Sequence, residues 1–172
     1  MKTQTIILSI IPLFCVSCIG FAADKPNFSG TWTLDRDKSF SNPPGLEQTM
    51  TITHNGDQIK LEGKQKTARG EVDLNESYTL DGKETDFTPP SPPNAKGKRK
   101  AYWLPNAKGI IVEDEITTDS PNGAVTQQIT RKWQLSTDGN VLTIDYYFDS
   151  ARGSFEAKRV FVKKNNATNK SQ

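Results

Sequence analysis

The chain has 172 residues, with 22 basic and 20 acidic side chains and a single histidine, so its formal charge is +2 at neutral pH. This near-neutral balance gives no electrostatic basis for binding nucleic acid, and one histidine leaves a His-based metal site without a second imidazole. Both cysteines, Cys15 and Cys18, precede residue 23, so the rest of the chain has neither a disulfide nor a thiolate ligand. We expect no metal and no cofactor.

The first 22 residues have the layout of a secretory signal peptide. Lys2 precedes an apolar run over residues 6–19, which is short for a membrane span, and small residues follow up to Ala22. We expect cleavage near Ala22, release of one folded domain (residues 23–163) to the periplasm or the exterior, and no stable membrane insertion afterwards. A lipoprotein acylated at Cys18 is the less favoured alternative.

From Trp32 onward, short runs alternate apolar and polar residues with a period of two, which is typical of β-strands. After a first strand around Trp32, the runs are 49–54, 58–63, 71–80, 83–88, 101–104, 109–117, 124–135, 140–148 and 154–162. Asn55-Gly56 and Asp81-Gly82 supply turns that predict hairpins between the runs they join. The tail, residues 164–172, has no apolar positions and is expected to be disordered.

Residues 88–100, TPPSPPNAKGKRK, combine four prolines with four basic residues. Proline cannot donate the amide hydrogen that a sheet requires, so we predict a long loop here. The loop is a solvated connector or, alternatively, the contact for a protein partner.

The connections predict how the strands assemble. Short turns join antiparallel neighbours, and a meander of many twisted strands tends to close because closure removes exposed edges. The predicted fold class is therefore all-β, with a single antiparallel up-and-down β-barrel of about 8 to 10 strands. A β-sandwich is the main rival, but it requires longer crossovers than this chain offers.

Several motifs resemble a known family. FSGTWTLDRDKSF, TMTITHNGDQIKL, SYTLDGKE and RKWQLSTDGNVLTI occur in an order similar to that of secreted bacterial lipocalin-like proteins of the calycin group, which are mostly uncharacterised. The resemblance implies that Trp32 closes one end of the barrel and that Arg159 on the last strand stacks over it. Gly30 would leave space for a sharp bend or for the close approach of another backbone.

Polar residues in phase with the apolar face mark the candidate binding positions. With the neighbouring aromatic residues, the candidates are Glu76, Tyr78, Asp114, Gln127, Arg131 and Trp133. In one interpretation they line a cavity and hold the polar end of a mostly apolar molecule. In the other they pair internally, as Glu76 or Asp114 with Arg131, because buried charges are costly unless paired.

The sequence favours a protein that binds a small apolar or amphipathic molecule without catalysis. The alternative is an envelope accessory or inhibitor-type interaction module with a packed barrel and a functional loop 88–100. An enzyme is less favoured, and it would need Glu76 or Asp114 with a raised pKa beside a cleft. His54 precedes the Asn-Gly turn and is expected to be an exposed turn residue rather than a catalytic base.

Overall fold

The computed structural model describes residues 25–90, 92, 94–121 and 123–164. The strands are β1 (Gly30–Phe40), β2 (Glu47–Asn55), β3 (Gln58–Thr67), β4 (Gly70–Thr79), β5 (Asp81–Phe87), β6 (Lys96–Trp103), β7 (Gly109–Ser120), β8 (Gly123–Leu135), β9 (Val141–Ser150) and β10 (Gly153–Lys163). Within the described ranges the chain forms no helix, and so none that could span a membrane. The predicted signal peptide and residues 165–172 of the tail lie outside these ranges.

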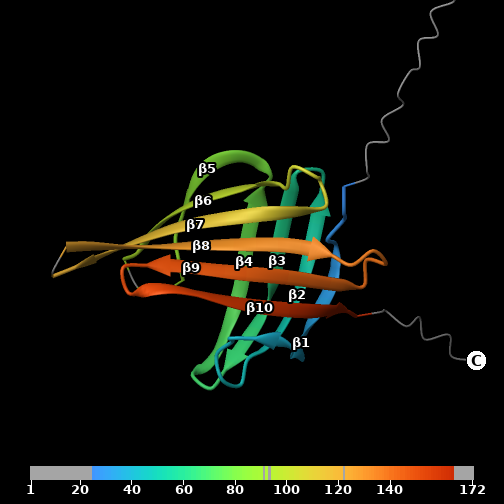
Figure 1. Ribbon diagram of the computed structural model, residues 1–172, viewed down its shortest axis with the longest axis horizontal. Coiled ribbons are helices and arrows are strands. Elements are labelled where there is room, and N and C mark those ends of the chain that lie inside the picture. The colour runs from blue at the N-terminus through green and yellow to red at the C-terminus, as the bar shows by residue number, and fades with distance from the viewer. Residues whose placement is uncertain (1–24, 91, 93, 122, 165–172) are drawn as a thin grey trace, which may run out of the picture.

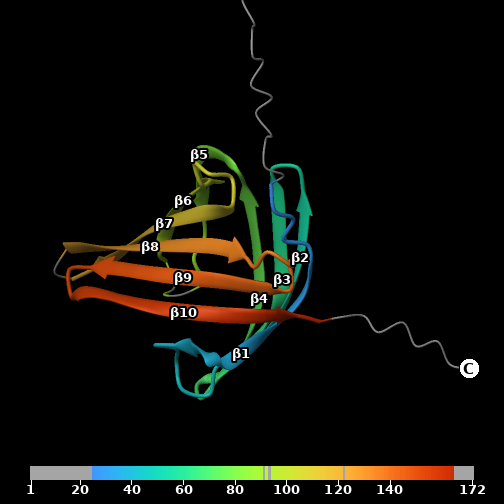
Figure 2. The same ribbon diagram turned by 45° about the vertical axis from the view of Figure 1, so that its right-hand side comes forward.

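The ten strands form one sheet in the order β4-β3-β2-β1-β10-β9-β8-β7-β6-β5. All of the pairings are antiparallel, and the first strand pairs with the last, with Trp32 opposite Lys163. The sheet curls until β7 to β10 cross the direction of β2 to β4 (Figures 1 and 2). The predicted all-β, up-and-down barrel is confirmed, and the barrel is nearly closed.

The barrel has a seam between β4 and β5. These strands follow each other in sequence but form the two edges of the sheet, so the hairpin predicted at Asp81-Gly82 is wrong. Gly82 does have the positive φ of a turn, at 72°. However, the Leu80 amide donates to the backbone oxygen of Asp57 at 2.8 Å, which ties the end of β4 to the β2–β3 turn. Beyond this point the chain crosses to the opposite edge of the sheet, where β5 pairs with β6.

The proline-rich loop is shorter than predicted. The last proline is residue 93, and β6 begins at Lys96, with Gly97, Arg99 and Ala101 buried and the lysines between them exposed. This alternation is that of a strand with one face in the core, and β6 pairs with both β5 and β7. The loop prediction is thus wrong from residue 96 onward. It was based on the prolines and basic residues of the segment and not on the alternation of exposed and buried positions.

Large apolar side chains fill the barrel around Trp32. Trp32 is fully buried, and its Nε1 donates to the backbone oxygen of Phe28 at 3.0 Å. Phe28 in turn packs edge-on against Trp133, with 6.0 Å between ring centroids. The N-terminal segment and the first strand thus pack into the core together.

The cation over Trp32 is Lys163 and not Arg159. The Lys163 Nζ lies 5.3 Å from the indole centroid, whereas the guanidinium of Arg159 lies 4.7 Å from the ring centroid of Tyr146. The register explains the difference, because Lys163 is the cross-strand partner of Trp32 on β10. The stacking expected between Arg159 and Trp32 is corrected accordingly.

Gly30 leaves space for that lysine. Its φ is +148°, and a Cβ at this position would lie 2.5 Å from the Lys163 Cε. The close neighbour is therefore a side chain on its way to Trp32, and not the backbone that the sequence suggested.

Candidate functional site

A layer of charged side chains and one tyrosine crosses the barrel interior from the seam. Glu76 and Tyr78 come from β4, Arg99 from β6, Asp114 from β7 and Arg131 from β8. Each lies an even number of residues from buried apolar neighbours on its own strand, so the pleat directs it inward. The layer is thus a product of the same alternation that builds the core.

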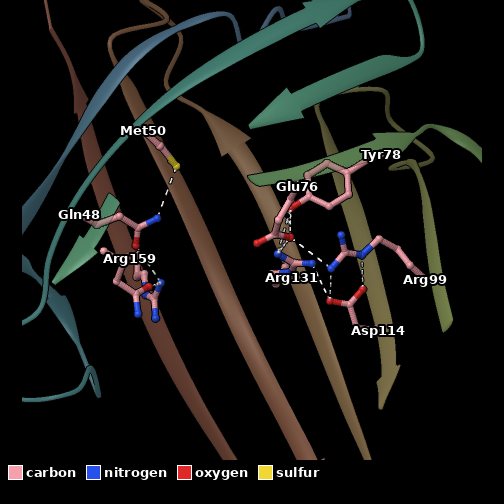
Figure 3. A network of polar contacts seen from close by, with 9 residues as sticks. Gln48, Met50, Glu76, Tyr78, Arg99, Asp114, Arg131 and Arg159 are labelled. Carbon is pink, nitrogen blue, oxygen red and sulfur yellow. Dashed lines mark hydrogen bonds and ion pairs between the residues drawn. The ribbon is translucent and has the colours of Figure 1, made fainter. Parts of the chain in front are cut away.

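Asp114 bridges two arginines. Its Oδ1 accepts from Arg99 Nε at 2.6 Å, and its Oδ2 accepts from Arg99 Nη2 at 2.9 Å and from Arg131 Nη2 at 2.7 Å (Figure 3). Asp114 is 6% exposed and Arg131 is 7% exposed. Charges this deeply buried are tolerated only when they are paired and hydrogen-bonded, and this geometry meets both conditions.

Glu76 joins the network from the edge strand β4. Its Oε2 accepts from Arg131 Nη1 at 2.8 Å, lies 3.2 Å from Arg99 Nη2 and accepts from the Tyr78 hydroxyl. Arg131 Nη1 also donates to the Tyr78 oxygen at 3.0 Å. Because β4 shares no backbone ladder with β5, these side-chain contacts tie β4 to β6 and β8 across the seam.

The lowered pKa of Glu76 argues against acid–base catalysis by this residue. Burial acts to raise the pKa of Glu76, but the positive charges of Arg131 and Arg99 lower it from 4.5 to about 2. The enzyme hypothesis required a raised pKa so that the carboxyl could exchange a proton near neutral pH, and for Glu76 that expectation is wrong. In the described part of the chain, no group of three or more His, Cys, Asp or Glu side chains could hold a metal.

A third arginine, Arg159, faces the interior from β10. Arg159 Nη1 donates to the amide oxygens of Gln48 at 2.9 Å and Gln65 at 3.1 Å, and its Nε donates to Asn42 Oδ1 at 3.2 Å. Among the ion pairs of the described residues, none includes Arg159. Neutral amides therefore hold this half-buried guanidinium, and they leave its charge uncompensated.

A cavity of about 110 Å³ lies between the two arginine groups. Arg131, Arg159, Glu76, Trp133 and Tyr146 are among its lining residues. Two buried donors of this lining, Arg131 Nε and Trp133 Nε1, have no hydrogen-bond partner in the described part of the chain. A buried donor without an acceptor costs about 1–3 kcal/mol. The residues that line the cavity therefore include two side chains with an unsatisfied N–H group and one arginine without an ionic partner.

Beyond the cavity, the inner face of the barrel becomes apolar and exposed. Val72 and Phe155 are both 55% exposed, and Val125 is also exposed. They lie in phase with Glu76, Arg159 and Arg131 on their strands, close to the β3–β4, β9–β10 and β7–β8 turns. In an antiparallel meander these alternate turns lie at the same end. We call this end of the barrel, toward which the three exposed side chains lie, the opening.

The structure distributes the six predicted ligand-binding residues over this region. Glu76, Arg131 and Trp133 line the cavity, while Tyr78 and Asp114 belong to the network beside it. Gln127 is half-buried on the Arg131 face of β8, nearer the opening. The internal pairs of Glu76 and Asp114 with Arg131, expected under the second interpretation, are present.

Sequence reasoning missed three polar residues of the interior. Arg99 was assigned to a loop, although it lies in phase with the apolar Ala101. Gln48 and Gln65 are in phase with Met50 and with Leu61 on their strands, and this alternation could have identified both.

His54 is half-buried, whereas an exposed turn residue was expected. Its Nδ1 accepts from the Phe28 amide at 3.3 Å, and burial lowers its pKa. Because this nitrogen is occupied by a backbone contact, His54 supports the N-terminal segment.

No protein-family model matches the chain, and no curated protein matches it in sequence. Among solved structures, zebrafish ileal bile acid-binding protein complexed with cholic acid has a TM-score of 0.51 and 15% identity, covering 80% of this chain and 98% of that one. A REP1-NXSQ fatty acid transporter (TM-score 0.49, 14% identity, 80% and 96% covered) and human cRBP IV (TM-score 0.47, 16% identity, 80% and 98% covered) are also similar. The likeness to the bile acid-binding protein is one of fold.

Proposed function

We propose that the chain is a binding protein that holds one small amphipathic molecule in its barrel and performs no catalysis. The acidic group of the ligand lies in the cavity between Arg131 and Arg159, and its mostly apolar part extends toward the opening. One observation carries this proposal: Arg159, whose guanidinium has no ionic partner among the described residues, lines the same small cavity as Arg131 and Trp133, which each have a side-chain N–H without an acceptor. The bile acid-binding protein and the fatty acid transporter of similar fold are named for amphipathic acids.

The size of the cavity indicates that only one part of the ligand lies inside it. A volume of about 110 Å³ is well below the roughly 300–1,000 Å³ of pockets that enclose a whole ligand. It suits a head group, while the remainder lies along the exposed apolar side chains of the opening. A carboxylate there would accept charge-assisted hydrogen bonds from guanidinium groups and would offset the cost of partly burying an unpaired cation.

The same proposal places the protein outside the cytoplasm. Residues 1–22 carry the signal-like pattern, so the working form begins at Ala23. The intact mass of the protein exported by its host tests this directly. A chain that keeps residues 1–22, or one that carries a lipid on Cys18, would contradict the proposed free form.

Calorimetric titration of the purified protein with dodecanoate, and with dodecanol as the uncharged analogue, tests the ligand site. We expect Arg159→Met to weaken dodecanoate binding about tenfold or more, since a charge-assisted hydrogen bond is lost, and to leave dodecanol binding unchanged. Lys158→Met is the matched control, because it removes the same charge from the neighbouring residue, which pairs with Asp145 rather than with the cavity.

Two outcomes would contradict the binding proposal. One is that neither dodecanoate nor a compact acid such as naphthalene-2-carboxylate binds saturably to the unaltered protein. The other is that Arg159→Met binds dodecanoate as tightly as the unaltered protein does.

A further inference from the structure

We propose that Gln48 and Gln65 determine the preference of the cavity for an acidic head group over a neutral one. They act as positioning residues, because their amide oxygens hold the guanidinium of Arg159 without neutralising its charge. This inference rests on the proposed function, since it takes the acidic group of the ligand to meet Arg159. It adds the residues that make the site selective for the charge of the ligand.

The charged layer beside the cavity has no surplus charge of its own. Its two carboxylates, Glu76 and Asp114, pair with the guanidinium groups of Arg99 and Arg131 at distances between 2.6 and 3.2 Å. The positive charge of Arg131, which lines the cavity, is therefore already compensated. The charged residues of the cavity lining are Glu76, Arg131 and Arg159, so Arg159 contributes the surplus positive charge.

Two glutamines from neighbouring strands direct their amide oxygens at one nitrogen of Arg159. Arg159 Nη1 donates to Gln48 Oε1 on β2 at 2.9 Å and to Gln65 Oε1 on β3 at 3.1 Å, and both glutamines line the cavity. The two are direct cross-strand partners, so the β2–β3 ladder places them side by side. Gln48 Nε2 donates to Met50 Sδ at 3.6 Å (Figure 3), and this contact leaves the amide oxygen for the arginine.

Neutral acceptors satisfy the hydrogen bonds of a guanidinium and leave its charge in place. A carboxylate at the same position would form an ion pair with Arg159, as Glu76 does with Arg131. Gln48 is only 6% exposed, and at such a buried position the interaction of two charges is stronger than at the surface. The acidic group of a ligand is then the partner that supplies the missing negative charge, which an alcohol does not have.

Calorimetric titration of Gln48→Glu with dodecanoate and with dodecanol tests this selectivity. We expect the preference for dodecanoate over dodecanol to fall about tenfold or more, because the introduced carboxylate neutralises Arg159 and repels the acid. Gln65→Glu, at the half-buried position of the same pair, should cause the same change. Gln58→Glu is the matched control and should keep the preference, because Gln58 is exposed and contacts Thr79 instead of the cavity.

A measurement without ligand separates the effect of charge from a structural effect. In Gln48→Glu, titration by carbon-13 NMR should give the introduced carboxyl a pKa below its ordinary value of about 4.3, because Arg159 favours the ionised form. When Arg159→Met is added, the pKa of the same carboxyl should rise above that value, because burial then acts without a compensating cation.

The results distinguish a failure of this inference from a failure of the proposed function. The inference is wrong if both glutamate variants keep the dodecanoate preference of the unaltered protein, or if that protein binds dodecanol as tightly as dodecanoate. It is also wrong if the pKa of the carboxyl introduced by Gln48→Glu is raised while Arg159 is present. An unaltered protein that binds neither dodecanoate nor naphthalene-2-carboxylate would refute the proposed function, and the inference with it.

Discussion

Replacing Trp32 by alanine is expected to lower the free energy of unfolding by about 3–5 kcal/mol. The indole is fully buried and donates to the Phe28 backbone oxygen, so the substitution leaves a large cavity and a carbonyl without its donor. Urea unfolding followed by circular dichroism measures the change, and the melting temperature should fall by on the order of 10 °C or more.

Trp32→Phe serves as the control for this prediction. It keeps most of the apolar volume and loses the hydrogen bond, so its cost should be clearly smaller than that of alanine. A Trp32→Ala protein that melts at the same temperature as the unaltered chain would show that the packing around the indole contributes little to stability.

The second large effect is expected at Arg131. Arg131→Met should destabilise the fold by about 3–5 kcal/mol, because it leaves buried carboxylates with too little compensating charge. Glu76 would keep only Arg99 as an ionic partner, and Asp114 would lose one of its two. Lys132→Met removes the same charge from the next position of β8 and should have little effect. Equilibrium unfolding in urea compares the two variants.

Removal of the whole network provides a sharper comparison. The variant carries Glu76→Leu, Tyr78→Phe, Arg99→Met, Asp114→Leu and Arg131→Met, so that the Tyr78 hydroxyl, which pairs with Glu76 and Arg131, is removed as well. Since an apolar replacement of a complete buried ion network is often neutral or stabilising, we expect its stability to match or exceed that of the unaltered protein. If it were less stable than the unaltered protein, the network would contribute net stability and the argument from desolvation would be incorrect.

Much of the barrel could be predicted because the period of two is imposed by strand geometry. Each polar residue that lay in phase with apolar ones in a recognised strand, such as Glu76 or Arg131, was directed inward in the structure. Arg99 obeyed the same rule but was missed, because the prolines before it and the lysines around it are typical of a loop. The prediction for this segment thus followed its proline and lysine content and not the period of two, which was also present.

The long-range features could not be predicted from alternation. Asp81-Gly82 fits a hairpin, but β5 pairs with β6 and not with β4, and nothing in the local sequence marks this difference. The aromatic partner of Arg159 depends on the register of β10 with β9 and with β1. The β1 register shifts at an irregularity between Asp35 and Phe40. Such registers are set by contacts between segments far apart in sequence.

The seam has a mechanical consequence for the barrel. Because β4 and β5 share no ladder of amide hydrogen bonds, the circumference of the barrel can grow at this place by separating side chains alone. Every other junction would have to break its main-chain hydrogen bonds to widen. A bulky ligand is therefore accommodated at the lowest energetic cost beside Glu76. There it would contact the guanidinium groups of Arg99 and Arg131, which connect the two sides of the seam.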